Sequence, residues 1–181
     1  MSMDPERQHD TVRLLRVLGD AWLQEPDDAL LARLAALSPL AEVVDASTAG
    51  ELAIAYSELF LQTIPPYASL FLSEDAMLNS DAAEHAQRSY GRAGFTVETE
   101  WRAGAADHLG VELHFTAYLL EAESPAWKAF LNEQVLSWAP VCCLAVERAD
   151  VAPLYPALAR LTKDVLLALG EIYASTVTNG S

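Results

Sequence analysis

Residues 105–120, AADHLGVELHFTAYLL, decide the fold of this 181-residue chain. Apolar and small side chains recur there at the spacing of one helix face: Leu109, Leu113, Thr116 and Leu120. Further apolar residues widen that face: Val111, Phe115, Tyr118 and Leu119. A face this wide is typical of a helix that is buried on much of its circumference. The segment therefore predicts a core helix.

Three titratable side chains lie at the start of this predicted core helix. Asp107 and His108 are adjacent, and Glu112 follows one helical turn after His108. We expect Asp107 to be the N-cap, because its carboxylate can accept from free backbone N–H groups and faces the positive end of the helix dipole. The contrast between a titratable start and an apolar body is the main functional signal in the sequence.

Length and composition predict one helical domain. A chain of 181 residues can bury one sizeable core, and its length requires no second domain. The residues are 52% hydrophobic, mostly Ala and Leu, with few Gly and Pro, which favours helices. We expect a single domain over residues 1–175, an all-α multi-helix bundle, followed by a disordered tail over residues 176–181.

Several classes of location and partner are disfavoured. No apolar run reaches the length of a membrane span, and residues 1–20 lack the pattern of a secretory signal, so we expect a cytoplasmic protein without stable membrane insertion. The net charge of −15 disfavours nucleic acid and anionic membranes and favours basic partners. The acidity also has a simpler interpretation, the solubility of an apolar helical domain.

Six further helices follow from periodicity and from helix start and stop signals. Their expected ranges are residues 5–23, 26–37, 48–64, 80–94, 124–138 and from 153 onward. Thr48 and Glu51 have the spacing of a capping box, and Gly94 can end a helix in the left-handed conformation. Pro140 is expected to end or kink the helix that begins after Ser124.

Two segments are predicted not to be helical. Residues 64–72, IPPYASLFL, should form an ordered loop because Pro65 and Pro66 each lack a backbone donor. Residues 95–101 alternate between apolar and polar side chains, which predicts a short extended segment without a partner strand.

Catalytic chemistry has little support in the sequence. Asp107, His108 and Glu112 have residue types that could bind a metal ion or transfer protons, but the other histidines belong to no ligand motif. Ser69 lies in no nucleophile elbow, and no glycine-rich phosphate loop is present in the sequence. We therefore expect no catalytic activity, no metal and no cofactor.

Four segments, taken in order, resemble a known family. They are YSELF at 56–60, PYASLFL at 66–72, YGRAGF at 90–95 and ADHLGVEL at 106–113. The succession is similar to the TorD/DmsD family of twin-arginine-signal-binding molybdoenzyme maturation chaperones, and the similarity extends over residues 52–173. The segment FLNEQVLSW at 130–138 also looks like the family's Phe-x-x-x-His-Leu-x-x-Trp pattern, with Gln134 in place of the histidine. Ala105 and Ala106 stand where the family usually has a proline.

The resemblance implies a TorD-like fold and a binding function. Members bind the twin-arginine signal peptide of a molybdopterin-containing oxidoreductase and support cofactor insertion before export. The implied partners are that signal peptide and the apo-form of the catalytic subunit. The resemblance carries over six peptide-binding positions: Phe60, Pro66, Tyr67, Ser69, Asp107 and His108. Helix geometry adds Glu112, and Trp138 is expected to meet the apolar part of the peptide.

Two alternatives stay open at this point. One is a chaperone of the nitrate-reductase-assembly type, which acts on a catalytic subunit that is not exported. The other is a metal-dependent enzyme that uses Asp107, His108 and Glu112. The oligomeric state is open as well, and a homodimer is compatible with the resemblance because family members exchange helices between protomers.

Overall fold

The structure is a computed structural model that describes residues 4–72, 81–97, 101 and 104–178. In these ranges the chain forms helices and no strand, and a single isolated antiparallel bridge pairs Tyr67 with His108. The prediction of an all-α fold is therefore confirmed.

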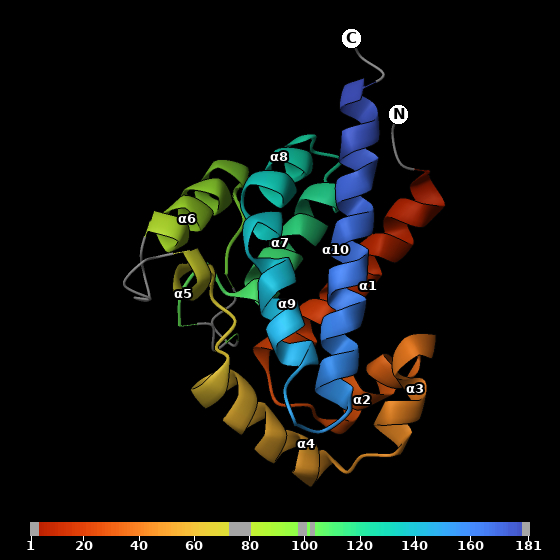
Figure 1. The fold of residues 1–181 in the computed structure, drawn as a ribbon. Coiled ribbons are helices and arrows are strands. Elements are labelled where there is room, and N and C mark those ends of the chain that lie inside the picture. The colour runs from red at the N-terminus through yellow and green to blue at the C-terminus, as the bar shows by residue number, and fades with distance from the viewer. Residues whose placement is uncertain (1–3, 73–80, 98–100, 102–103, 179–181) are drawn as a thin grey trace.

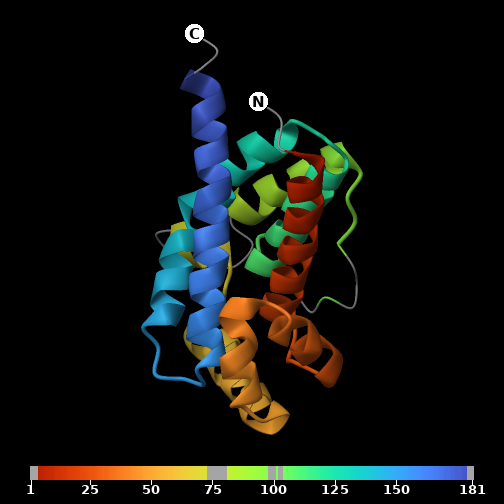
Figure 2. The same ribbon diagram turned by 90° about the vertical axis from the view of Figure 1, so that its right-hand side faces the viewer.

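The helices follow one another with short connections. In chain order they are α1 Pro5–Leu23, α2 Asp28–Ala35, α3 Ser38–Asp45, α4 Ala49–Tyr56, η1 Ser57–Thr63, α5 Ala68–Leu72, α6 Asp81–Ala93, α7 Leu109–Glu121, α8 Ala126–Glu133, η2 Val135–Ser137, α9 Ala139–Glu147 and α10 Leu154–Thr178. The start of α1 and the end of α10 lie at one end of the molecule, and α4 lies at the opposite end (Figures 1 and 2).

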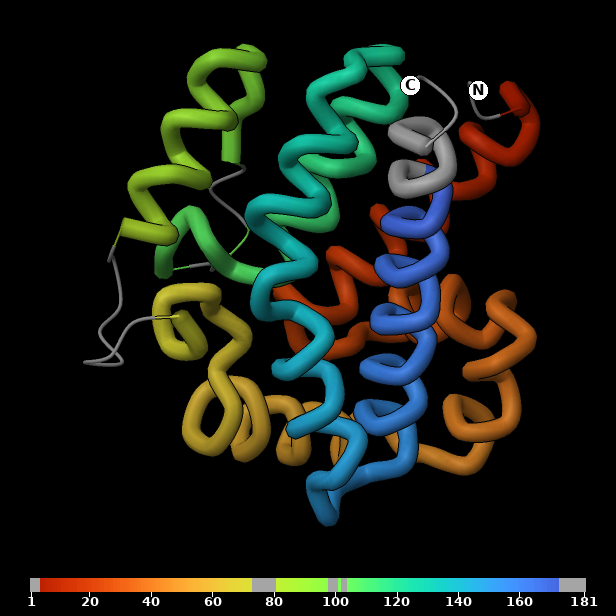
Figure 3. Tube along the Cα trace, turned by 45° about the horizontal axis from the view of Figure 1, so that its top comes forward, coloured from red at the N-terminus to blue at the C-terminus, as the bar shows by residue number. Residues whose placement is uncertain are grey.

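Helix α7 is the central element, as residues 105–120 predict. It packs against α1, α6 and α8, while α10 packs against α9, α3, α8 and α1. Figure 3 shows α5 and α6 on one side of α7 and α8, with α10 on the other side. Every residue of α7 is buried except His114, Tyr118 and Glu121. Amphipathic helices on several sides thus bury the wide apolar face.

Two glycines let α1 and α7 approach closely. A Cβ atom on Gly110 would lie 2.4 Å from Leu23 Cγ and 2.6 Å from the Gly19 carbonyl oxygen. A Cβ atom on Gly19 would lie 2.6 Å from His114 Cδ2. Side chains at these positions would force the two helices apart, so the glycines set the distance between α1 and the core helix.

Buried aromatic side chains join α1, η1 and α10. The Phe60 ring contacts Trp22 at 4.9 Å and Tyr155 at 5.3 Å between ring centroids. Trp22 Nε1 donates to Thr162 Oγ1 at 3.0 Å, and the Tyr56 hydroxyl donates to the Trp22 carbonyl at 3.0 Å. The polar atoms of these rings have partners, so burying them does not leave unpaired donors.

The N-terminal region contains one helix that the sequence did not predict. Residues 38–45 form α3, although the sequence predicts no helix between residues 37 and 48. Pro39 lies in the first turn of α3, where its missing N–H has no intrahelical partner to lose. The same dipeptide therefore ends one helix and begins the next.

The predicted loop at residues 64–72 is half correct. Residues 64–67 are not helical, but Ala68–Leu72 forms α5. The helix that begins at the Thr48–Glu51 capping box is confirmed, and after Tyr56 it continues in π-helical geometry as η1. A π-helix has no clear signal in a sequence, and it is frequent at functional sites.

The predicted helix after Ser124 is interrupted. Helix α8 ends at Glu133, η2 follows, and α9 begins at Ala139 with Pro140 in its first turn. A break is therefore present, but it lies before Pro140, which begins the next helix and does not end the first one. In the described residues no single helix combines the length and apolarity of a membrane span, although the pair Ala126–Ser137 and Ala139–Glu147, bent by 46°, meets that test when combined.

Two expectations lie partly outside the described residues. Helix α10 continues to Thr178, so the first three residues of the predicted tail at 176–181 are helical, and residues 179–181 are not described. The predicted extended segment at 95–101 includes residues 98–100, which are also not described, and its first three residues form no strand. The single-domain assignment stays a prediction.

The close approach of α1 and α7 yields a test. Gly110→Ala should lower the free energy of unfolding by about 1–3 kcal/mol, because the new methyl group overlaps Leu23 and the Gly19 carbonyl. Gly91→Ala in α6 is the matched control, since nothing lies within 4 Å of its added Cβ. It should raise the free energy of unfolding by about 0.5–1 kcal/mol. Urea denaturation measures both, and a Gly110→Ala protein as stable as the wild type would contradict the close crossing.

Candidate functional site

The site is built on the pairing of two segments, which we call the 67–108 junction (residues 66–68 and 107–109). Two backbone hydrogen bonds join them, from Ala68 N–H to the Asp107 carbonyl at 3.0 Å and from Leu109 N–H to the Pro66 carbonyl at 2.9 Å. The rings of Tyr67 and His108 meet edge to face, with centroids 4.9 Å apart. The junction thus fixes the loop before α5 against the start of α7.

Asp107 has a different role from the predicted one. It is fully buried, and its Oδ2 accepts from the Ser69 N–H at 2.7 Å, so it binds the first turn of α5 instead of capping α7. The N-cap of α7 is His108, whose Nδ1 accepts from the Gly110 N–H at 3.1 Å. The predicted N-cap is therefore wrong by one residue. The other carboxylate oxygen, Oδ1, and the Ser69 hydroxyl are buried and lack hydrogen-bond partners among the described residues.

His108 is held in its neutral form. Burial lowers its pKa to about 3, because the charged imidazolium would lose its hydration. Since Nδ1 accepts a hydrogen bond, the ring proton of the neutral form belongs on Nε2. His108 therefore contributes no positive charge to the site near neutral pH.

Glu112 is a buried acid at the first turn of α7, with 1% of its surface exposed. Burial raises its pKa well above the ordinary value, the hydrogen bond from Trp138 lowers it, and the nearby Asp107 carboxylate raises it again. That hydrogen bond joins Trp138 Nε1 to Glu112 Oε2 at 3.1 Å. The balance favours the protonated acid, so Glu112 keeps its proton at a pH where an exposed glutamate is charged.

The first of two pockets at the junction, which we call the aromatic pocket, has a volume of about 360 Å³. It lies between the end of α1, the π-helix η1 and the junction. Its lining includes Glu25, Phe60, Leu61, Tyr67 and His108. Phe60 is buried, but Leu61 is 65% exposed and Glu25 is on the surface. The pocket therefore combines apolar walls with a carboxylate at its edge.

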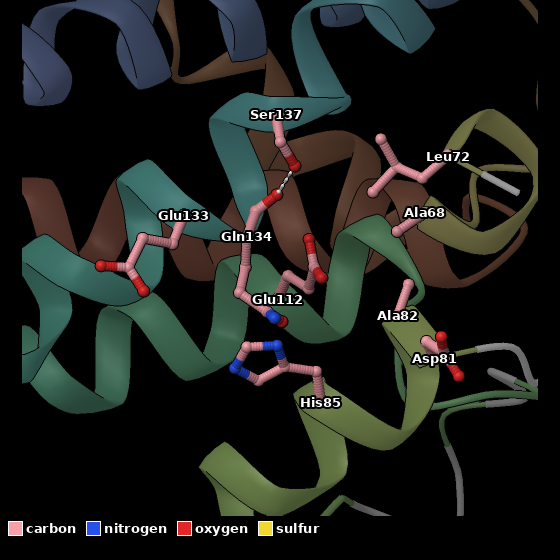
Figure 4. A pocket seen from close by; sticks show the side chains of 9 residues that line it. All are labelled: Ala68, Leu72, Asp81, Ala82, His85, Glu112, Glu133, Gln134 and Ser137. Atoms are coloured by element: carbon pink, nitrogen blue, oxygen red, sulfur yellow. Dashed lines mark hydrogen bonds between the residues drawn. The ribbon is translucent and has the colours of Figure 1, made fainter.

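The second pocket, which we call the acidic pocket, has a volume of about 460 Å³. It is lined from α5, α6, α7 and the break after α8, and its polar side chains are Asp81, His85, Glu112, Glu133, Gln134 and Ser137. Figure 4 shows Glu112, Gln134 and His85 directed toward the middle of the pocket, with Asp81 and Glu133 on opposite sides. Glu112 is buried, whereas Asp81, His85 and Glu133 are exposed.

The predicted site residues are divided among three places. Phe60, Tyr67 and His108 line the aromatic pocket, and Glu112 lines the acidic pocket. The remaining four are buried around the junction: Pro66, Ser69, Asp107 and Trp138. Trp138 also packs against Phe71, with ring centroids 5.6 Å apart.

Several pocket residues were missed in the sequence. Glu25 and Leu61 line the aromatic pocket, and Asp81, His85 and Glu133 line the acidic pocket. Glu25 follows the end of α1 and Leu61 belongs to η1, while the other three lie on α6 and α8, so nothing in the sequence groups them. Exposed residues of this kind become recognisable as a site only when the fold places them around one cavity.

The geometry gives no support to the metal-dependent alternative. Within the described ranges no group of three or more His, Cys, Asp or Glu side chains is arranged to hold a metal ion. One Asp107 oxygen and the His108 Nδ1 already accept backbone hydrogen bonds. The expectation of no metal stays a prediction.

Comparison with known proteins identifies the family. The nitrate reductase delta subunit family matches residues 24–144, which is more than half of the chain. The chain belongs to this family. It is also similar to proteins named chaperone protein TorD, so the resemblance to TorD/DmsD proteins is confirmed.

The similarity to TorD proteins covers part of each chain. The Vibrio parahaemolyticus protein is 32% identical over 127 residues, covering 61% of this chain and 59% of the relative. The Aliivibrio salmonicida protein is 30% identical over 142 residues, covering 67% of this chain and 66% of the relative. The matched region thus spans three fifths to two thirds of these relatives.

A solved structure supports the fold. An Archaeoglobus fulgidus protein, provisionally described as a redox enzyme maturation protein, superposes with a TM-score of 0.59 at 20% identity. The match covers 92% of this chain and 97% of that protein. Gln134, the residue that departs from the family pattern, lines the acidic pocket. The departure therefore lies in the candidate site.

The buried Glu112 predicts a pH-dependent stability difference. Its folded pKa is raised, so the folded protein binds the proton more tightly than the unfolded chain, and stability should fall as pH rises above 4.5 toward the folded pKa. Glu112→Gln cannot titrate, so it lacks this pH dependence of stability, and its side-chain oxygen still accepts from Trp138. Its stability relative to wild type should grow with pH, by up to about 1.4 kcal/mol per pH unit. Urea denaturation from pH 4.5 to 8 tests this, with exposed Glu133→Gln as the control, and a constant difference would contradict it.

His108 predicts the opposite pH dependence. Its folded pKa of about 3 lies below the unfolded value of 6.5, so its contribution is present above pH 6.5 and is lost as pH falls toward 3. His108→Asn keeps an N-cap acceptor for Gly110 but cannot titrate. Wild type should therefore lose stability relative to the variant between pH 6.5 and 4, as measured by chemical denaturation. Parallel stability curves would show that His108 is not buried in its neutral form.

Proposed function

We propose that the protein is a cytoplasmic maturation chaperone that binds the N-terminal signal segment of a molybdopterin-containing oxidoreductase. The apo-form of the catalytic subunit is the proposed client, held until its cofactor is inserted and before it is exported. Membership of the nitrate reductase delta subunit family and similarity to TorD chaperones support this function. The observation that carries it is the 67–108 junction, which contributes Tyr67 and His108 to the aromatic pocket and Ala68 to the acidic pocket.

The aromatic pocket suits the apolar part of such a segment. Leu61, which is largely exposed, Tyr67 and the buried Phe60 all give the pocket apolar surface. Glu25 at the edge can meet a basic residue next to the apolar stretch. A segment with a basic start and an apolar continuation therefore has complementary groups within one pocket.

The sequence places Asp107 and Glu112 among the expected peptide-binding residues, but their burial changes how they can act on a basic peptide. Asp107 is fully buried and Glu112 is almost fully buried, so neither presents an open negative surface to a peptide. Long-range attraction of a basic segment comes instead from exposed carboxylates and from the net charge of −15. Asp107 supports binding indirectly, because it holds α5 against α7.

A second candidate function comes from the family description itself. A chaperone of nitrate reductase assembly would act on a catalytic subunit that is not exported, and the matching family is that of the nitrate reductase delta subunit. The N-terminus of the client separates the two functions, since only an exported client needs a twin-arginine signal. A pull-down from the native host, followed by sequencing of the co-purifying subunit, decides between them.

The aromatic pocket gives a direct test of peptide binding. Leu61→Ala should weaken binding of a synthetic peptide with paired arginines before an apolar stretch by roughly 5- to 30-fold, because it removes apolar contact area. Ile54→Ala is a matched control, since Ile54 is 64% exposed on α4 and lies outside both pockets. Titration calorimetry at low and high salt measures both variants.

The salt series separates contact from charge. Leu61→Ala and Tyr67→Ala should weaken binding with little change in salt dependence, whereas Glu25→Gln should reduce the salt dependence itself. Melting curves control for folding, especially for Tyr67, which packs on His108. Equal losses for Leu61→Ala and Ile54→Ala would place the peptide site elsewhere on the protein.

A further inference from the structure

We propose that the acidic pocket receives a guanidinium group, the side chain of an arginine in the client segment, with the Glu112 carboxyl as its ligand. This inference rests on the proposed function and assigns a specific chemistry to a pocket that the family membership does not describe. It begins from the position of one buried acid in a cavity large enough for a side chain.

The carboxyl of Glu112 has one oxygen available. Trp138 Nε1 donates to Oε2, and no other described residue donates to this carboxyl. Glu112 nevertheless lines the pocket and is directed into it (Figure 4). A buried carboxyl with a free oxygen can accept from a ligand donor, and the indole keeps the carboxyl in a fixed orientation while it does so.

The surroundings of Glu112 suit a long cationic side chain. Ala68, Leu72 and Ala82 give the pocket apolar wall where the methylene groups of an arginine can pack. Asp81 and Glu133 are exposed acids in the same lining, and the described lining residues include no Lys or Arg. The field in the pocket therefore favours a cation.

The burial of Glu112 selects a guanidinium over an ammonium group. A guanidinium is more weakly hydrated than an ammonium group, so bringing it against the buried Glu112 carboxyl costs less. It also stays protonated at any ordinary pH, whereas a buried lysine readily loses its charge. Its planar donors can address Glu112 and the side-chain oxygen of Gln134, which point into the same pocket (Figure 4).

Binding of the guanidinium releases a proton. In the free protein burial keeps Glu112 protonated, and the arriving cation favours its ionised form. The carboxyl O–H bond breaks, its proton passes to the buffer, and a carboxylate–guanidinium ion pair forms. The titratable groups facing Glu112 are Asp107 before α7, Asp81, His85 and Tyr90 on α6, and Glu133 on α8. His85 is the histidine among them, so the experiment needs a control at this position.

Titration calorimetry of the full chain tests the proposal. The probes are a synthetic peptide with paired arginines before an apolar stretch, the same peptide with citrulline at both arginines, and arginine amide alone. Citrulline keeps the shape of arginine but carries no charge. Each probe is measured at pH 6 and pH 8 in two buffers of different ionisation enthalpy, which reports the protons released.

The wild type should bind the arginine peptide about tenfold or more tightly than the citrulline peptide, and its affinity should rise with pH. Binding should release up to about one proton. Glu112→Gln should abolish that release and weaken the arginine peptide about tenfold at pH 8, with no effect on the citrulline peptide. His85→Asn and Glu133→Gln should keep the proton release. The arginine peptide should also bind more tightly than arginine amide.

The outcomes separate this inference from the proposed function. If the arginine and citrulline peptides bind equally, or if Glu112→Gln leaves affinity and proton release unchanged, the inference is wrong while Leu61-dependent peptide binding still supports the function. If arginine amide binds as tightly as the peptide, the ligand is a free small molecule and the assignment to a client side chain is wrong. If arginine amide binds through Glu112 but no peptide does, both the assignment to a client side chain and the proposed function are wrong.

Discussion

The hydrogen bond between the Ser69 N–H and the buried Asp107 carboxylate is the interaction on which the candidate site depends. It spans 2.7 Å between residues 38 positions apart, and the backbone bonds of the 67–108 junction flank it. A carboxylate that accepts from backbone N–H groups at a helix start is well stabilised even when buried. Without it, α5 would lose the acceptor for its first turn and both pockets would lose a wall.

The two pockets share the 67–108 junction, so the shape of each depends on the same two segments. Tyr67 lines the aromatic pocket and its neighbour Ala68 lines the acidic pocket; on the facing segment, His108 lines the first and Glu112, one turn later, lines the second. A shift of either segment would therefore alter both cavities together. This arrangement suits a client segment with one apolar and one basic part. The aromatic pocket can receive the apolar part and the acidic pocket the basic part, and the same rigid junction supports both pockets.

Burial shifts the pKa values of two groups at the start of α7 in opposite directions. It raises the pKa of Glu112 and lowers the pKa of His108. Burial favours the protonated form of Glu112 and the uncharged form of His108, so it disfavours charge on both titratable residues at the start of the core helix. Glu112 lowers stability as pH rises above 4.5, and His108 lowers stability as pH falls below 6.5. Residues that cost stability in this way and line cavities are common at functional sites.

The sequence by itself determined the longer helices and the family. Apolar periodicity predicts α7 as the core helix, the capping box at Thr48 predicts α4, and the order of short segments indicates the relationship to TorD proteins. These signals are local, because the residues that start a helix or form its buried face lie within a few helical turns of one another in the sequence. The tertiary structure decided the site. Three features of the site depend on how helices distant in the sequence pack together. They are the α5 N–H group that donates to Asp107, the burial of Glu112, and the position of Glu133 and Asp81 around one pocket. A sequence does not show whether a carboxylate is a helix cap, a surface charge or a buried ligand. Only the neighbours of the carboxylate in space distinguish these roles.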